Sequence, residues 1–292
     1  MYFKMTRAAV IVAGGAAALC LGSVPAALAA PASGAYFVPC SAGALHAAIE
    51  KADPGATLDL APGCTYYLPD ALPEIMHELT IVGYHSTLTR ARDAGGFSLL
   101  EVGCEAGDLT VINVSFTDGG GYDVGKGGAI YNDGGTLHVT GGTFSDNESN
   151  NEGGAIYNDG DMTVDNAAFT GNLAHYGGAI FNSDDSTAFI RGSDFAWNKA
   201  PTKTGAMLYN SYGGAIYNAG TLHLANSEFL ANSTGGYGGA IYNDATLDAA
   251  HITATLNSAA FGGGIYNADD TTLFASVVFG NNPDNCVDVT GC

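Results

Sequence analysis

Gly127-Gly-Ala-Ile-Tyr-Asn132 decides the fold, because this hexapeptide returns along the chain. The spacing from one isoleucine to the next is 26, 24, 36, 25 and 24 residues. A unit that recurs near every 25 residues, with one insertion, predicts a solenoid of stacked turns. Three further copies are identical and two are variants: Gly153–Asn158, Gly213–Asn218 and Gly238–Asn243, then Gly177–Asn182 and Gly262–Asn267.

A second element, Phe-x-x-Asn, keeps step with the first. Between the two elements lie alternating segments such as Thr136–Val139, Met162–Val164 and Thr221–Leu224, which predict half-buried strands. Three short strands in each turn of about 25 residues predict an all-β parallel β-helix with turns about 4.8 Å apart. The Phe-x-x-Asn copies are Phe144–Asn147, Phe169–Asn172, Phe195–Asn198, Phe229–Asn232 and Phe279–Asn282, and only Ala254–Asn257 lacks the aromatic residue.

Alternation along each strand assigns the side chains to inside and outside. We expect Ile130 and Asn132 to point inward and Tyr131 outward, and the same in every turn. The inward asparagines can then hydrogen-bond one another along the axis, and the phenylalanines can stack as core. The paired glycines permit the positive φ and the close backbone approach that a corner needs.

The two ends of the chain differ from the repeats. Residues 1–29 combine Lys4, Arg7, an apolar run and Ala27-Leu-Ala29, which predicts a secretory signal peptide. We expect a cap with a short helix over residues 30–64, in which Ser41 is the N-cap, then β-helix repeats over 65–282, clearest over 127–282. Degenerate strands precede the clear repeats: Thr57–Leu60, Tyr66–Leu68, Leu79–Val82, Phe97–Val102 and Leu109–Phe116.

Cysteines support an exported protein. In an oxidising compartment we expect the pairs Cys40–Cys64, in the cap, and Cys286–Cys292, closing residues 283–292. Cys104 is left over, and the sequence allows it to be buried, free or paired with Cys40 or Cys64. No later apolar run is long enough to span a bilayer. The prediction is therefore a secreted protein, extracellular or attached to a cell surface.

Charge restricts the partners. Without Lys4 and Arg7, the formal charge of −20 becomes −22. A surface this negative repels nucleic acid and anionic lipid, and argues against polyuronate substrates unless cations intervene. A glycan or a surface protein is the expected partner.

The pairing of Gly-Gly-Ala-Ile with Phe-x-x-Asn resembles the repeat of the chlamydial polymorphic outer-membrane protein family, over roughly residues 127–282. The head segment from Cys40 to Cys64 resembles secreted β-helix repeat proteins of actinobacteria. These resemblances imply a right-handed parallel β-helix of the pectin-lyase-like type. In the chlamydial relatives they imply a surface adhesin with a membrane barrel, whereas this sequence stops ten residues after Asn282.

One aromatic residue per turn follows the isoleucine, and stacked turns would place these residues in an exposed ladder. The ladder is either structural or a surface for sugar rings or a partner protein. A second candidate is the insertion from Lys199 to Tyr212, a basic loop on an acidic rod that carries Lys203 and follows Trp197. The ladder residues are Tyr131, Tyr157, Phe181, Tyr217, Tyr242 and Tyr266.

Acidic residues follow the asparagines of the hexapeptide. Stacked carboxylates repel unless a cation lies between them, so the row could bind Ca²⁺, although no cofactor is required. Aspartates that form turns explain the same residues without metal. His138 and His223 lie three turns apart and cannot share a metal ion. The acidic residues are Asp133, Asp159, Asp184, Asp185, Asp244, Asp269 and Asp270.

The sequence thus predicts a non-enzymatic recognition or adhesion protein that presents an elongated face, with no catalytic residue assigned. The alternative is a polysaccharide-degrading enzyme, a glycoside hydrolase or a lyase, that uses the aspartate row. An ice-binding face would need a regular outward threonine array, which Thr136, Thr221, Thr246 and Thr272 supply only in part.

Overall fold

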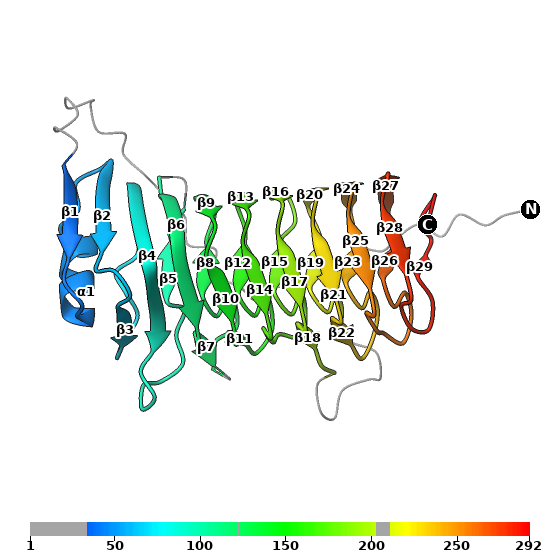
Figure 1. Cartoon of the computed structure of the whole chain (residues 1–292), viewed down its shortest axis with the longest axis horizontal. Helices are drawn as coiled ribbons and strands as arrows, with labels where there is room; N and C mark the ends of the chain where they lie inside the picture. Colours follow the sequence, from blue (N-terminus) through cyan, green and yellow to red (C-terminus); the bar gives the residue numbers. More distant parts are fainter. Residues whose placement is uncertain (1–33, 105, 122, 203–210) are drawn as a thin grey trace, which may run out of the picture.

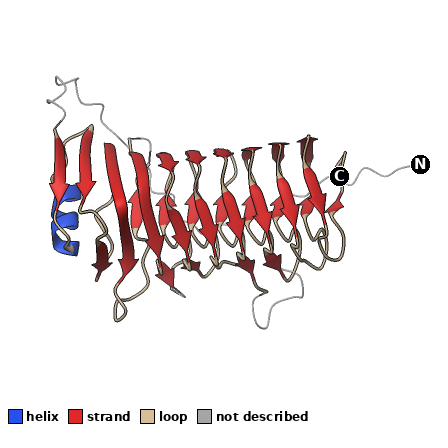
Figure 2. Ribbon diagram, viewed as in Figure 1, coloured by secondary structure: helices blue, strands red, loops and turns tan. Residues whose placement is uncertain are grey.

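The computed structural model describes residues 34–104, 106–121, 123–202 and 211–292. The predicted signal peptide and Lys203 lie outside these residues. These residues form an elongated stack of parallel strands, and the single helix among them lies at the N-terminal end of the stack (Figures 1 and 2). The expected all-β parallel β-helix is confirmed. Among the described residues one column holds ten stacked strands, so the stack has about ten turns.

Three columns of strands form the walls. The first column holds β1 (Ala35–Val38), β2 (Ala56–Leu60), β4 (Glu78–Arg90), β6 (Asp108–Thr117), β9 (Thr136–Thr140), β13 (Asp161–Asp165), β16 (Thr187–Arg191), β20 (Thr221–Ala225), β24 (Thr246–Ala250) and β27 (Asp270–Phe274). The second column holds β3 (Thr65–Leu68), the C-terminal halves of β4 and β6, β10 (Thr143–Ser145), β14 (Ala168–Thr170), β17 (Asp194–Ala196), β21 (Glu228–Leu230), β25 (Thr253–Thr255) and β28 (Val277–Phe279).

The third column carries the hexapeptides. It holds β5 (Leu100–Val102), β8 (Ile130–Asn132), β12 (Ile156–Asn158), β15 (Ile180–Asn182), β19 (Ile216–Asn218), β23 (Ile241–Asn243), β26 (Ile265–Asn267) and β29 (Cys286–Val287). Two short strand pairs lie at a corner between the columns. They are β7 (Gly120–Gly121) with β11 (Glu148–Ser149), and β18 (Lys199–Ala200) with β22 (Ser233–Thr234).

Register between turns is residue for residue. Ile156 pairs with Ile130 and Ile180, and Asn158 with Asn132 and Asn182. The isoleucines are fully buried, as the alternation predicted. Each residue type therefore forms a continuous row along the axis.

Two buried asparagine rows tie the turns together. In the third column, Asn132 donates to the Oδ1 of Asn158 at 2.7 Å, and Asn158 donates to Asn182 at 2.8 Å. A second row runs from Asn147 to Asn281 through the Phe-x-x-Asn elements. These bonds satisfy amides that would otherwise be buried without partners.

The phenylalanine core also forms, with one correction. Phe144, Phe169, Phe195 and Phe229 stack at 4.7–4.8 Å, and Phe116 extends the row by one turn. The expected element Phe279–Asn282 is wrong by one residue. Val278 pairs with Ala254, and Asn281 occupies the asparagine row. Because strand residues alternate, the one-residue shift turns Phe279 outward.

The paired glycines meet two separate constraints, seen at Gly213 and Gly214. Gly213 has φ +64°, and a Cβ there would overlap the carbonyl oxygen of Ile216. A Cβ on Gly214 would overlap the carbonyl oxygen of Gly239 in the next turn. The first glycine is thus required for the bend and the second for the distance between turns.

The N-terminal end is closed by α1 (Ala42–Glu50), whose Leu45 and Ile49 are buried. Ser41 occupies the N-cap position, but its side chain makes no capping hydrogen bond. The strands of the expected cap, β1 and β2, already pair in register with each other. No helix of the described residues is long and apolar enough to cross a membrane.

The expected disulfides Cys40–Cys64 and Cys286–Cys292 are confirmed. Cys104 is disulfide-bonded as well, so it pairs with neither Cys40 nor Cys64.

Candidate functional site

The predicted aromatic ladder exists but is less exposed than expected. The rings of Phe181 and Tyr217 stack at 4.8 Å, and those of Tyr242 and Tyr266 at 5.5 Å. Tyr157 is only 4% exposed, and the other five residues are half-buried. The ladder is therefore less exposed than the sequence predicted, because a second row of side chains packs beside the first.

This second row was missed by the sequence analysis. Its members are the residues that precede each glycine pair in the C-terminal half: Tyr176, Tyr212, Tyr237 and Phe261. The rings stack along the axis with centroids 5.1–5.7 Å apart. The position before each Gly-Gly was the available signal, since it reads Lys, Glu, Tyr, Tyr, Tyr, Phe along the chain.

The two rows contact each other edge to face. Tyr212 lies 6.1 Å from Tyr217 and 4.7 Å from Tyr242, and Tyr237 lies 4.9 Å from Tyr266. We call this surface the tyrosine face. It comprises Tyr176, Tyr212, Tyr217, Tyr237, Tyr242, Phe261 and Tyr266.

Stacking determines what the tyrosine face offers to a ligand. Successive rings of the second row are 11–19° from parallel, so neighbouring rings cover one another's faces, and only Tyr176 and Phe261 at the two ends keep one face without a ring of the row against it. Ring edges are left on the outside, and an edge carries the positive part of the aromatic quadrupole. A sugar that stacks on a ring needs a free ring face. The geometry thus favours edge contacts and hydrogen bonds over sugar stacking.

The phenols of Tyr212, Tyr217 and Tyr242 stay protonated at neutral pH. Burial, and then the negative charge of Asp244, raises the pKa of both Tyr217 and Tyr242. Burial also raises the pKa of Tyr212. Neutral phenols can both donate and accept a hydrogen bond at neutral pH.

At the N-terminal end of the ladder, the neighbouring row is charged instead of aromatic, because Lys126 and Glu152 precede the first two glycine pairs. The Lys126 ammonium donates to the Tyr157 hydroxyl at 3.0 Å and lies 5.6 Å from the Tyr131 ring centre. The Tyr131 hydroxyl donates to Asp133 at 2.6 Å. Burial lowers the pKa of Lys126, but the bond to Tyr157 and nearby negative charges outweigh it and leave the pKa raised.

Glu101 lies beside Tyr131 in the strand register. Burial, followed by repulsion from Glu74 and Asp133, raises the pKa of Glu101. Sequence reasoning did not single out Glu101, because its turn lacks the hexapeptide. A carboxyl group with a raised pKa next to an aspartate is one arrangement suited to acid–base chemistry.

The aspartate row is interrupted. Asp133 and Asp159 follow paired asparagines on adjacent turns, but Ser183 and Ala219 hold that position on the next two turns, before Asp244. Asp184, Asp185 and Asp269 lie in exposed turns beyond it. Across the described part of the chain, no group of three or more His, Cys, Asp or Glu side chains could hold a metal ion. Calcium binding therefore stays a prediction.

The remaining candidates lie elsewhere. Trp197 is 61% exposed at a corner and has φ +54°. It comes from the turn after β17, outside the tyrosine face. His138 and His223 do occupy equivalent outward positions three turns apart, and His223 contacts Asp248 at 3.4 Å.

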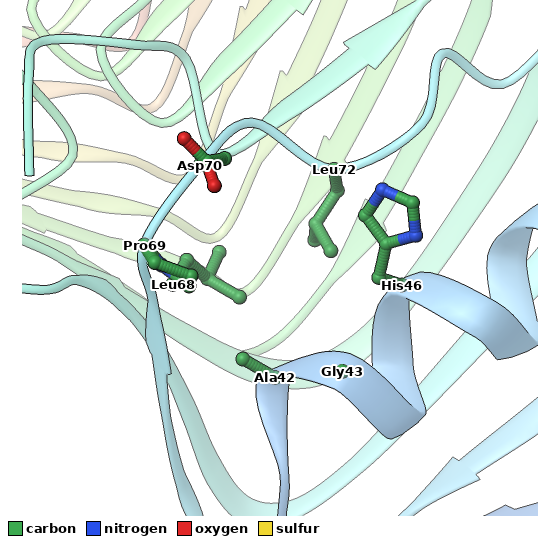
Figure 3. A pocket seen from close by; sticks show the side chains of 7 residues that line it. All are labelled: Ala42, Gly43, His46, Leu68, Pro69, Asp70 and Leu72. Carbon is green, nitrogen blue, oxygen red and sulfur yellow. The ribbon is translucent and has the colours of Figure 1, made fainter.

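A cavity of about 140 Å³ lies between α1 and the segment after β3 (Figure 3). Leu68 and Leu72 line it, and Figure 3 shows His46 and Asp70 on opposite sides. It is smaller than the roughly 300–1,000 Å³ of ordinary ligand sites, and its polar groups do not converge.

Comparisons with known proteins agree with the repeat. Residues 141–159 match the Chlamydia polymorphic membrane protein (Chlamydia_PMP) repeat. This segment runs from β10 through β12 and joins one Phe-x-x-Asn to one hexapeptide, so the expected resemblance is confirmed at the level of the repeat. No curated protein sequence matches the chain.

Two solved structures are similar in shape. The PL6 family alginate lyase AlyGC shares 16% identity with a TM-score of 0.48, over 90% of this chain and 41% of the enzyme. An alginate lyase from Paenibacillus sp. str. FPU-7 shares 13% identity with a TM-score of 0.36, over 83% of this chain and 99% of the enzyme. This chain therefore spans about two fifths of the first enzyme's length. Likeness at this level says nothing about activity.

Proposed function

We propose that this protein is a secreted or cell-surface recognition protein whose tyrosine face binds another protein. The observation that carries the proposal is the double row of aromatic rings, whose edges and neutral hydroxyls share one side of a rigid rod. Tyrosine supplies contact area and hydrogen bonds at low entropic cost, and it is enriched in protein interfaces.

Two features favour a protein partner over a glycan. Within the second row the ring faces lie against neighbouring rings, so a sugar could stack only at the two end rings, Tyr176 and Phe261. Successive turns are fixed by buried asparagine rows, so the hydroxyls are held in place before binding. Preorganised groups bind with a smaller entropic cost.

The experiment is binding of the fluorescently labelled protein to intact cells of the producing organism and of an epithelial line. Cells treated with protease are compared with cells treated with glycosidases. Saturable binding that protease abolishes supports a protein partner. Binding that only glycosidase removes would shift the proposal to a glycan, and no binding to any surface would contradict it.

One observation favours a second candidate, a polysaccharide-degrading enzyme. Repulsion from the nearby Asp133 is one of the causes that raise the pKa of Glu101, and the Tyr131 hydroxyl donates a hydrogen bond to that aspartate. Such an enzyme would release reducing ends or unsaturated products from a panel of neutral and acidic polysaccharides. Activity that disappears in Glu101→Gln would establish this candidate, and wild-type protein without turnover would eliminate it.

A further inference from the structure

A groove of about 370 Å³ opens beside the second strand column, near the N-terminal end of the rod. It lies where β3 pairs with the end of β4, two strands at the N-terminal end of the stack (Figure 1), and none of its lining residues belongs to the tyrosine face. The groove is lined by Tyr67, Thr89, Arg90, Ala91, Arg92 and Asp118.

The groove brings together two of the three arginines that follow the predicted signal peptide. The third arginine, Arg191, forms a two-pronged pair with Asp165 through Nε at 2.7 Å and Nη2 at 2.9 Å. By contrast, neither Arg90 nor Arg92 takes part in a salt bridge within the described residues. On a chain with a net charge of −20, two unpaired guanidinium groups in one groove need a reason.

Arg90 carries the more specific signal. Its Nη1 donates to the carbonyl oxygen of Ala94 at 3.0 Å, which fixes the orientation of the guanidinium. Its Nε is buried and has no hydrogen-bond partner, and it is the one such side-chain atom among the described residues. Because Nε is covered and Nη1 is already bonded to Ala94, Nη2 is the nitrogen through which Arg90 can meet a carboxylate in the groove.

The other lining groups suit a hydroxylated ring. Tyr67 is 65% exposed, so it can cover the apolar side of a sugar, unlike the stacked rings of the tyrosine face. Asp118 is exposed and can accept hydrogen bonds from sugar hydroxyls, while the same carboxylate repels a second negative charge.

We propose that this groove binds a sugar acid, through its carboxylate at Arg90 and Arg92 and its hydroxyls at Asp118. The negative charge of the whole chain opposes long polyanions. The site therefore takes a single acidic sugar, free or at the end of a glycan, and it works independently of the tyrosine face.

The test is titration of the full-length secreted protein with glucuronate, glucose and acetate, followed by ligand-detected NMR at low salt. Glucuronate should bind at least about tenfold more tightly than glucose or acetate. Arg90→Gln should weaken glucuronate binding about tenfold or more, and the matched variant Arg191→Gln should leave it unchanged. Circular dichroism of each variant confirms folding.

Tyr67→Ser tests the contact with the sugar ring separately from the contact with the carboxylate. It should weaken glucuronate binding and leave acetate binding unchanged. Equal affinities for acetate and glucuronate would overturn the assignment to a sugar acid. Unchanged glucuronate affinity in folded Arg90→Gln would overturn the site itself. A neutral glycan terminus that competes as well as an acidic one would also contradict the proposal.

Discussion

Replacing Asn172 with alanine tests how the turns are held together. Its amide donates to the carbonyl oxygen of Phe144 at 2.9 Å and to Asn198 at 2.9 Å. Its Oδ1 accepts from the backbone N–H of Asn147 at 3.1 Å and from the side chain of Asn147 at 3.0 Å. Asn172 is fully buried. Alanine would leave the Phe144 carbonyl and the Asn147 N–H without these partners.

Each orphaned buried group costs about 1–3 kcal/mol, so two of them give a loss of about 2–6 kcal/mol in the free energy of unfolding. The matched control is Asn150→Ala, since Asn150 is half-buried and only its backbone N–H appears in a hydrogen bond. We expect the control to change stability by less than about 0.5 kcal/mol.

Urea denaturation followed by circular dichroism and by the fluorescence of Trp197 measures both variants. Coincidence of the two signals checks that unfolding is cooperative, which a repeat protein does not guarantee. Equal stabilities of the two variants would refute the view that buried asparagine rows stabilise the stack.

Three further predictions concern single positions. Gly214→Ala should destabilise the protein by about 1–3 kcal/mol or prevent folding, because its Cβ meets the Gly239 carbonyl, whereas Gly95→Ala, with open space around it, should be neutral in the same denaturation assay. Glu101→Gln should stabilise the protein at pH 7, since a raised pKa in the folded state makes the charged form costly; the gain should vanish as the pH falls below 4.5, and a gain independent of pH would contradict this cause. If the aspartate row binds Ca²⁺, thermal melting should give a higher midpoint with calcium than with chelator, and one common midpoint would remove metal from the account.

Much of the fold could be predicted because each row of stacked side chains is visible in the sequence as one residue type that recurs at a regular spacing. The spacing of Ile130 and its counterparts predicted the register that places them in one buried row. The prediction for Phe279 failed because no hexapeptide follows the last turn to fix its alignment, and nothing in the local sequence distinguishes Phe279 from Val278. In the structure Val278 pairs with Ala254 of the neighbouring turn and takes the buried position.

The candidate site was harder to predict, because the second row of the tyrosine face begins only at Tyr176. The equivalent residues in the two preceding turns are Lys126 and Glu152, so the row lies outside the repeated hexapeptide and is not visible as a repeat. Packing between Tyr212 and Tyr242 depends on a corner whose angle the sequence does not reveal. The groove at Arg90 depends on β3 and β4, which carry no repeat signal.

The most direct test of the recognition proposal is the affinity of Tyr212→Phe/Tyr237→Phe for the cell surface that the wild-type protein binds. Both rings keep their stacking, and only two hydroxyls are lost. At about 0.5–1.5 kcal/mol for each hydrogen bond, affinity should fall roughly 5- to 150-fold, while Tyr36→Phe, an exposed tyrosine on β1, should bind as wild type. Equal binding by wild type and the double variant would contradict the account.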